Sequence, residues 1–257
     1  MWQELREELR PQGVEIVTVC LDTADPALSM PYVEAASPTH PTLFDPHHLV
    51  DELFGMINVP NGVWIDENGM IVRPAESAWP GERAEAPASD DAPVAEAEPT
   101  PTEPAPEMPS RIIEMMGQAA QIVSNRDSYA AALRDWAANG ADSQFVMSAD
   151  EVLAASGPRG AHESSAAAHF ELATHLEMEG NHDAAVPHFA AAHRLAPDNW
   201  TYRRQAWSIE PSALPGPMSR FWQGPIDGNE DAWPYEGSWV DDIKVSGPAN
   251  YYKPMQT

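Results

Sequence analysis

The sequence contains few cysteines and few basic residues. A single cysteine, Cys20, occurs among 257 residues, so neither an intrachain disulfide nor a cysteine-rich metal site is possible within them. Lysine and arginine total 14 against 40 aspartates and glutamates, which gives a formal net charge of −26. Nucleic acids and anionic membranes are bound through cationic surfaces. We therefore expect neither as a partner.

Long apolar runs are also missing. No run of apolar residues approaches the length of a membrane span, and the first residues, MWQELREEL, lack the basic start and apolar core of an export signal. These absences predict a cytoplasmic protein. Nothing in the composition indicates a cofactor, and we predict none.

The first 73 residues alternate between helical and strand patterns. Trp2, Leu5 and Leu9 are spaced for one face of a helix, and the β-branched run 14–22 is typical of a strand covered on both faces. The apolar runs within 58–72 are joined by a turn that ends in Asn-Gly, which predicts a hairpin. Shorter elements are expected as helices at 26–36 and 47–55 and a strand at 41–45.

The composition changes after residue 73. Residues 74–109 contain nine prolines, nine acidic residues and one basic residue. Such a segment buries too little apolar surface to offset the entropy of ordering it, which predicts a disordered linker. Residues 110–210 return to helical patterns. A helix is expected over 110–138, with Tyr129, Leu133 and Trp136 at helical spacing. A capping box at Ser148 and Glu151 begins a short helix over 148–156.

Two adjacent helical segments resemble a tetratricopeptide repeat of about 34 residues. They read SSAAAHFELATHLEMEG and HDAAVPHFAAAHRLAPDN, with small residues where two helices approach each other. The concave face of such repeats commonly binds a protein or peptide, and the acidic chain favours a basic partner. Residues 110–156 and 199–209 are expected to flank the repeat, and 211–257 to form an irregular aromatic tail over one of two domains. The candidate partner-binding residues are His169, Leu172, Leu176 and Phe189.

Residues 1–73 resemble the thioredoxin-like redoxins, which include thiol–disulfide oxidoreductases and peroxiredoxins. The resemblance is carried by GVEIVTVCLD and by HPTLFDPHHLVDELFGMINVPNGVWIDENGMIVRP. It implies an α/β thioredoxin-like domain, here followed by an α-helical repeat domain. It also places Val59 and Pro60 on the family's cis-proline loop, which implies a substrate-binding role for both.

The resemblance begins within the family's first helix. In the family, the Cys-x-x-Cys motif or peroxidatic cysteine stands at the start of that helix, after the first strand. Neither that strand nor that motif has a counterpart here, so we expect a truncated domain with an open sheet edge beside residues 14–21. Two interpretations remain: a shortened copy of a redoxin, or a redoxin-derived module without its chemistry.

Cys20 is the one candidate for catalysis. It falls near the carboxyl end of a strand, where sites in α/β sheets open, but a free cysteine also serves as a small core residue. A metal site at His40, His47 and His48 would need a carboxylate such as Asp45 or Asp51. Adjacent histidines at a helix start are more often exposed to solvent, so we predict no metal.

Two functions are therefore considered. The first is a redoxin-family oxidoreductase or antioxidant protein fused to a helical interaction module and impaired by the missing cysteines. The second is a non-catalytic adaptor built from the same two parts. A Cys-x-x-Cys motif encoded upstream of Met1 would favour the first hypothesis.

Overall fold

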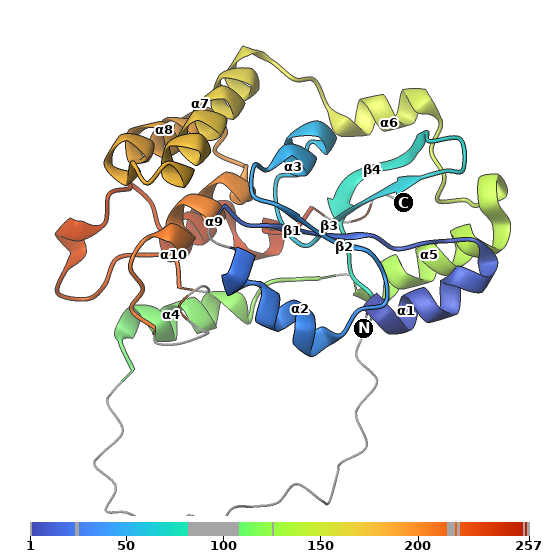
Figure 1. Ribbon diagram of the computed structural model, residues 1–257, viewed down its shortest axis with the longest axis horizontal. Coiled ribbons are helices and arrows are strands. Elements are labelled where there is room, and N and C mark those ends of the chain that lie inside the picture. The colour runs from blue at the N-terminus through green and yellow to red at the C-terminus, as the bar shows by residue number, and fades with distance from the viewer. Residues whose placement is uncertain are drawn as a thin grey trace, which may run out of the picture.

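The computed structural model describes residues 2–23, 26–81, 108–124, 126–214, 219, 222–253 and 255. An α/β part with four strands lies beside a helical part (Figure 1). Among the described residues, no helix combines the length and apolar character that crossing a bilayer requires. The helices are α1 (Trp2–Leu9), α2 (Met30–Ala36), α3 (Leu49–Phe54), α4 (Ser110–Ala119), α5 (Arg126–Asn139), α6 (Ala149–Ser156), α7 (Ala161–Met178), α8 (His182–Leu195), α9 (Trp200–Ile209) and α10 (Trp239–Ser246).

The four strands form two separate pairs. Strands β1 (Thr18–Leu21) and β2 (Thr42–Asp45) are parallel, whereas β3 (Asn61–Ile65) and β4 (Ile71–Ser77) are antiparallel. The expected hairpin is therefore present, and β4 continues beyond its predicted end. Asp66 stabilises the turn, because its Oδ1 accepts the backbone N–H groups two and four residues later at 2.9 and 2.8 Å.

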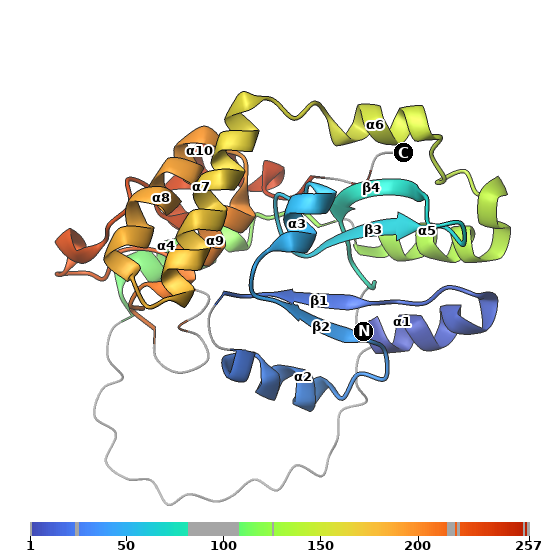
Figure 2. The same ribbon diagram turned by 45° about the horizontal axis from the view of Figure 1, so that its top comes forward.

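The two pairs lie with β1 and β3 as the inner strands. Figure 2 shows the order β2, β1, β3, β4, with β1 and β3 running in opposite directions. In the part of the chain that the structure describes, ladders join only β1 to β2 and β3 to β4. The inner strands consequently face each other without pairing.

The α/β part has its own apolar core, to which a distant helix contributes. Leu5 and Leu9 of α1 pack with Trp64 of β3 and with Tyr129 and Leu133 of α5. The Trp64 indole donates to the Tyr129 hydroxyl at 2.9 Å. Helix α5 follows the proline-rich segment in sequence, so the chain returns to the α/β part before it forms α7 and α8.

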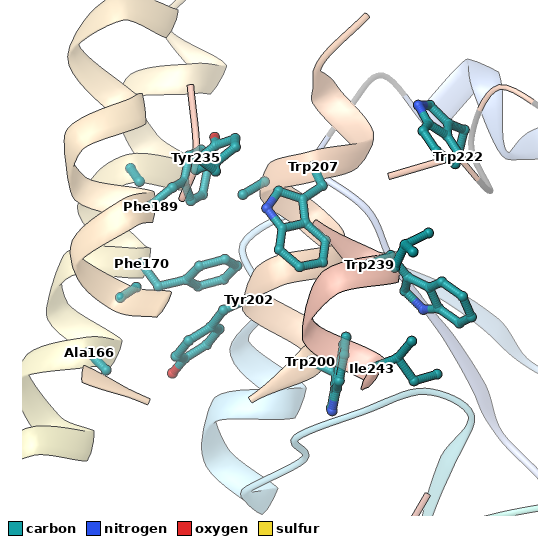
Figure 3. Close-up of a cluster of buried hydrophobic side chains, with 14 of the residues drawn as sticks. Ala166, Phe170, Phe189, Trp200, Tyr202, Trp207, Trp222, Tyr235, Trp239 and Ile243 are labelled. Atoms are coloured by element: carbon teal, nitrogen blue, oxygen red, sulfur yellow. The ribbon is translucent and has the colours of Figure 1, made fainter. Parts of the chain in front are cut away.

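The larger core belongs to the helical part (Figure 3). Helices α7 and α8 pack closely because alanines of zero exposure line their contact, and the rings of Phe170 and Phe189 lie 5.7 Å apart beside them. The ring of Tyr202 of α9 stacks on Phe170 at 4.2 Å. Helix α9 therefore gives the α7–α8 pair a further surface against which to bury its apolar face.

Three predictions about the elements need correction. The strand expected over 14–22 covers only Thr18–Leu21 and is half-buried, because β1 has one neighbouring strand instead of two. The helix expected over 110–138 is divided into α4 and α5. The tail contains an ordered helix, α10, capped by Ser238, so it is less irregular than its prolines predicted.

The predicted linker also begins too early. Residues 74–77 belong to β4, and Ala78 is only 2% exposed, with its backbone N–H donating to the carbonyl of Pro60 at 3.3 Å. The Trp79 ring packs edge-on against Tyr252 at 5.2 Å. These contacts order residues 74–81, whereas residues 82–107 lie outside the described part of the chain.

Candidate functional site: strand ends and facing edges

Cys20 lies within β1 and is half-buried. Burial, followed by the charge of Asp22, raises the pKa of its thiol. A raised pKa lowers the thiolate fraction, and the thiolate is the nucleophile in disulfide exchange. The environment of Cys20 thus resembles that of a core residue, and exchange between two thiols requires a second one from outside these 257 residues.

A buried polar cluster lies where α3 begins, close to the carboxyl ends of β1 and β2. His48 has a left-handed backbone (φ 56°), and its Nδ1 lies 3.1 Å from Oδ2 of Asp51. Its Nε2 lies 2.9 Å from Oε1 of Gln205 on α9, which also accepts the backbone N–H of Thr23 at 3.0 Å. This cluster joins the α/β part to the helical part.

The three candidate histidines of this region are not brought together. His47 is exposed as predicted, but His48 is buried. Its burial is tolerated because both ring nitrogens have hydrogen-bond partners, Asp51 and Gln205. His40 is buried beside the hydroxyl of Thr18, and burial lowers its pKa. Within the described ranges, no three metal-binding side chains converge.

The Val59–Pro60 peptide is cis and directly precedes β3, as the redoxin resemblance implies. Both residues are half-buried. The tail holds this loop, because Nδ2 of Asn58 donates to the carbonyl of Tyr251 at 2.7 Å. The backbone N–H of Trp200 also donates to the carbonyl of Ile57 at 2.7 Å. The ring of Tyr251 also packs against Trp200 of α9 at 4.7 Å, so the tail contacts both parts of the molecule and not one domain alone.

The residues proposed to bind a partner on the repeat occupy different environments. Phe189 has zero exposure between α7 and α8, which places it in the core and not on a binding surface. Leu176 is partly buried against the same core. Leu172 is 42% exposed, and the half-buried His169 directs Nδ1 toward Nδ1 of His188 at 2.8 Å. Of the four, only Phe189 is fully inaccessible, and Leu172 is the most exposed.

Strands β1 and β3 each have an edge without a neighbouring strand in the described chain. The sequence predicted such an open edge on β1 but not on β3. The backbone N–H of Thr18 donates to the carbonyl of Pro41 on the β2 side at 3.0 Å. Successive residues of a strand direct their backbone groups to opposite sides, so the N–H and C=O groups of Val19 point away from β2. The carbonyl of Pro60 accepts the backbone N–H of Ala78 on the β4 side, so the backbone N–H and C=O groups of the next residue, Asn61, point away from β4. We call the backbone of β1 at Val19 and of β3 at Asn61 the facing edges.

Apolar side chains accompany the facing edges. Val17, which precedes β1, is 53% exposed, and Ile65 at the end of β3 is 44% exposed. Val17 lies before the start of β1 and Ile65 at the end of β3. Because the two strands run in opposite directions (Figure 2), both residues lie at the same end of the facing edges. In addition, the buried Oδ1 of Asn61 has no hydrogen-bond partner among the described residues. The region therefore combines unpaired backbone, exposed apolar surface and an unpartnered polar atom.

No family model, curated protein or solved structure matches this chain. The similarity to redoxins is thus one of sequence pattern, and functional assignment depends on the geometry just described. The geometry offers two kinds of site: strand edges that could accept a polypeptide, and a thiol that is poorly suited to react.

Proposed function

We propose that this chain is a redoxin-derived binding protein that takes up an extended polypeptide segment between β1 and β3. One observation carries the proposal: the two strand pairs turn unpaired edges toward each other. Backbone N–H and C=O groups need hydrogen-bond partners when they are buried. An unpaired strand edge is a template for another strand, and this mode of peptide binding recurs in many proteins.

The strand directions specify how such a segment would lie. A strand placed parallel to β1 would be antiparallel to β3, because β1 and β3 run in opposite directions (Figure 2). It would pair on both sides and join the two pairs into one sheet. Since β1 has four residues and β3 has five, the ladder would span about four or five residues.

The surroundings suggest the chemistry of the segment. Side chains alternate between the two faces of a strand, and the exposed Val17 and Ile65 favour apolar residues at alternate positions. The chain carries a net charge of −26, which favours lysine or arginine on the flanks of the segment. The partner class is therefore a basic protein with a short β-prone segment.

A thiol–disulfide oxidoreductase is the second candidate, supported by the sequence resemblance. The half-buried Cys20 with its raised pKa does not favour it. Under this alternative, the added segment would have to supply the reacting thiols just after its strand, where redoxins carry them at the start of the first helix. The adaptor needs no such thiols, and for this reason we place it first.

Peptide binding to the full chain tests the proposal. Fluorescence anisotropy with a panel of labelled eight-residue peptides, apolar at alternate positions and flanked by lysines, should identify a ligand. The Val19→Pro variant removes one N–H from the facing edge without removing any donor to β2, and should weaken binding at least tenfold. Val19→Thr, which keeps the N–H, should bind normally. Equal affinity for Val19→Pro and Val19→Thr, or no binding by any peptide, would refute strand addition.

A grafting experiment separates the two candidates. A redoxin-type strand followed by Cys-x-x-Cys is joined ahead of Trp2, and reduction of insulin disulfides is measured against a twin with Ser-x-x-Ser. Thiol-dependent turnover in the first chain alone would favour the oxidoreductase. No turnover, in a folded graft, is the result that the adaptor predicts.

A further inference from the structure

His48, Asp51 and Gln205 form a buried triad at the contact between α3 and α9. Their exposed fractions are 3%, 2% and 4%. His48 and Asp51 belong to the α/β part, whereas Gln205 belongs to the helical part. The ring of Phe170 on α7 closes the site, 5.0 Å from the His48 ring and nearly perpendicular to it. The triad is thus shielded from water on the side of the repeat.

Hydrogen bonding fixes how many protons the triad holds. Oε1 of Gln205 accepts the backbone N–H of Thr23, so this oxygen, and not the amide nitrogen, faces His48. Nε2 of His48 must therefore carry a proton and donate it. A second proton must lie between Nδ1 and Oδ2 of Asp51, because two lone pairs would otherwise face each other at 3.1 Å. The triad holds one proton more than a neutral histidine beside an ionised aspartate.

We propose that this triad is a proton-dependent latch that holds α3 against α9. When the second proton is present, every His48 nitrogen is bonded and the pair with Asp51 is neutral overall. When it leaves, a negative charge is buried without compensation and the Nδ1 contact becomes repulsive. Because Gln205 also binds Thr23, two residues after β1, release of the latch would loosen the end of that strand.

The surrounding charges favour the protonated form. Asp45, at the end of β2, adds a second carboxylate near His48, and its Oδ2 accepts the backbone N–H of Val50 at 2.7 Å. From α3, Glu52 is bonded by the Tyr202 hydroxyl of α9 at 3.0 Å and paired with Arg159. The charge of Arg159 is thus already engaged by Glu52. The groups that act directly on His48 are acidic or neutral.

The pKa shifts agree with this geometry. Burial alone would lower the pKa of His48, but the hydrogen bond and charge of Asp51, with smaller effects of Gln205 and Asp45, raise it overall. For Asp51, in contrast, burial itself raises the pKa, and the opposing effect of His48 is smaller. Both shifts mean that the folded state binds more protons than the unfolded state. The latch is therefore closed below the ordinary histidine pKa and opens as pH rises through the raised one.

The Asp51→Asn variant separates the proton from the shape of the triad. The introduced amide could donate from its Nδ2 to Nδ1 of a neutral His48. Its Oδ1 could still accept the Glu52 backbone N–H, as the Asp51 carboxylate does at 3.0 Å. The variant thus keeps the bonds and removes the need for the second proton. His47→Asn, on the exposed neighbouring histidine, is the matched control.

Amide exchange of Thr23, followed by NMR from pH 6 to 10, tests the latch in the full chain. In the natural protein and in His47→Asn, the protection factor should fall by up to tenfold per pH unit above the raised pKa of His48. In Asp51→Asn it should stay constant. A flat profile in the natural protein, or an equal fall in Asp51→Asn, would overturn the proposal. Neither result depends on peptide binding at the facing edges, so the two proposals fail independently.

Discussion

At the scale of single residues, the environment of His48 is set by its hydrogen-bond partners, one of which is near in sequence and the other distant. The capping role of Ser148 was predictable because Glu151 lies three residues away, and the structure contains that capping box. The burial of His48 was not predictable, because Gln205 lies 157 residues further along the chain. Local patterns thus identified caps and turns, whereas the buried polar site depends on tertiary packing.

His193 should make the protein less stable in acid. Burial, followed by the charge of Arg203, lowers its pKa to about 3. Between that value and the ordinary histidine pKa of about 6.5, the unfolded state binds a proton that the folded state does not. Stability should therefore fall as pH decreases through this window, by up to about 1.4 kcal/mol per pH unit.

Urea unfolding at pH 7 and pH 5 measures this effect. The loss on acidification should be smaller in His193→Gln than in the natural protein, and unchanged in His162→Gln, where the histidine is exposed. Equal losses in the natural protein and His193→Gln would show that His193 does not control acid stability.

Phe189 should contribute strongly to the stability of the helical part. Its side chain has zero exposure and lies 5.7 Å, ring to ring, from Phe170. Phe189→Ala should lower the free energy of unfolding by about 3–5 kcal/mol, because it removes buried apolar contacts and leaves a cavity. The exposed Leu172 is the control, and Leu172→Ala should change stability by about 0.5 kcal/mol or less. Similar losses in both variants would contradict the packing described.

At the scale of elements, the sequence predicted the strands and the hairpin but not the partners of each element. Periodicity indicated a helix through Tyr129, Leu133 and Trp136, and α5 contains all three. It could not show that α5 packs against α1 and β3, since Tyr129 meets Trp64 across 65 residues of chain. Likewise, the continuous apolar run at 14–22 predicted a strand covered on both faces. Apolar character alone does not show whether a second strand pairs beside it, and β1 pairs only with β2 in the described chain.

Gly62 tests the contact between β3 and α5. A Cβ atom at this position would lie 2.6 Å from the Tyr129 hydroxyl and 2.9 Å from Cβ of Ala78, so Gly62→Ala must displace one of them. Overpacking of this kind costs about 1–3 kcal/mol. Gly117→Ala in α4 meets nothing within 4 Å and should instead stabilise by about 0.5–1 kcal/mol. Urea unfolding of both variants should give opposite signs, and a stabilising Gly62→Ala would contradict the close approach.

At the scale of the whole molecule, two parts of different architecture are held together by polar contacts and by the tail. The triad joins α3 to α9, and Asn58 binds the carbonyl of Tyr251. The sequence predicted an α/β segment, an acidic segment and a helical segment in this order. It did not predict their docking, because the contacts involve single polar residues with no periodic signal. The docking leaves the facing edges of β1 and β3 unpaired within the described chain.

Amide exchange at the facing edges tests the central claim most directly. With a bound β-prone peptide, the amides of Val19 and Asn61 should become protected, because their N–H groups point away from β2 and β4 and belong to the facing edges. The Thr18 amide, already bonded to Pro41 at 3.0 Å, should not change. Peptide binding that leaves Val19 and Asn61 exchanging as before, and protects residues of α7 and α8 instead, would contradict strand addition between β1 and β3.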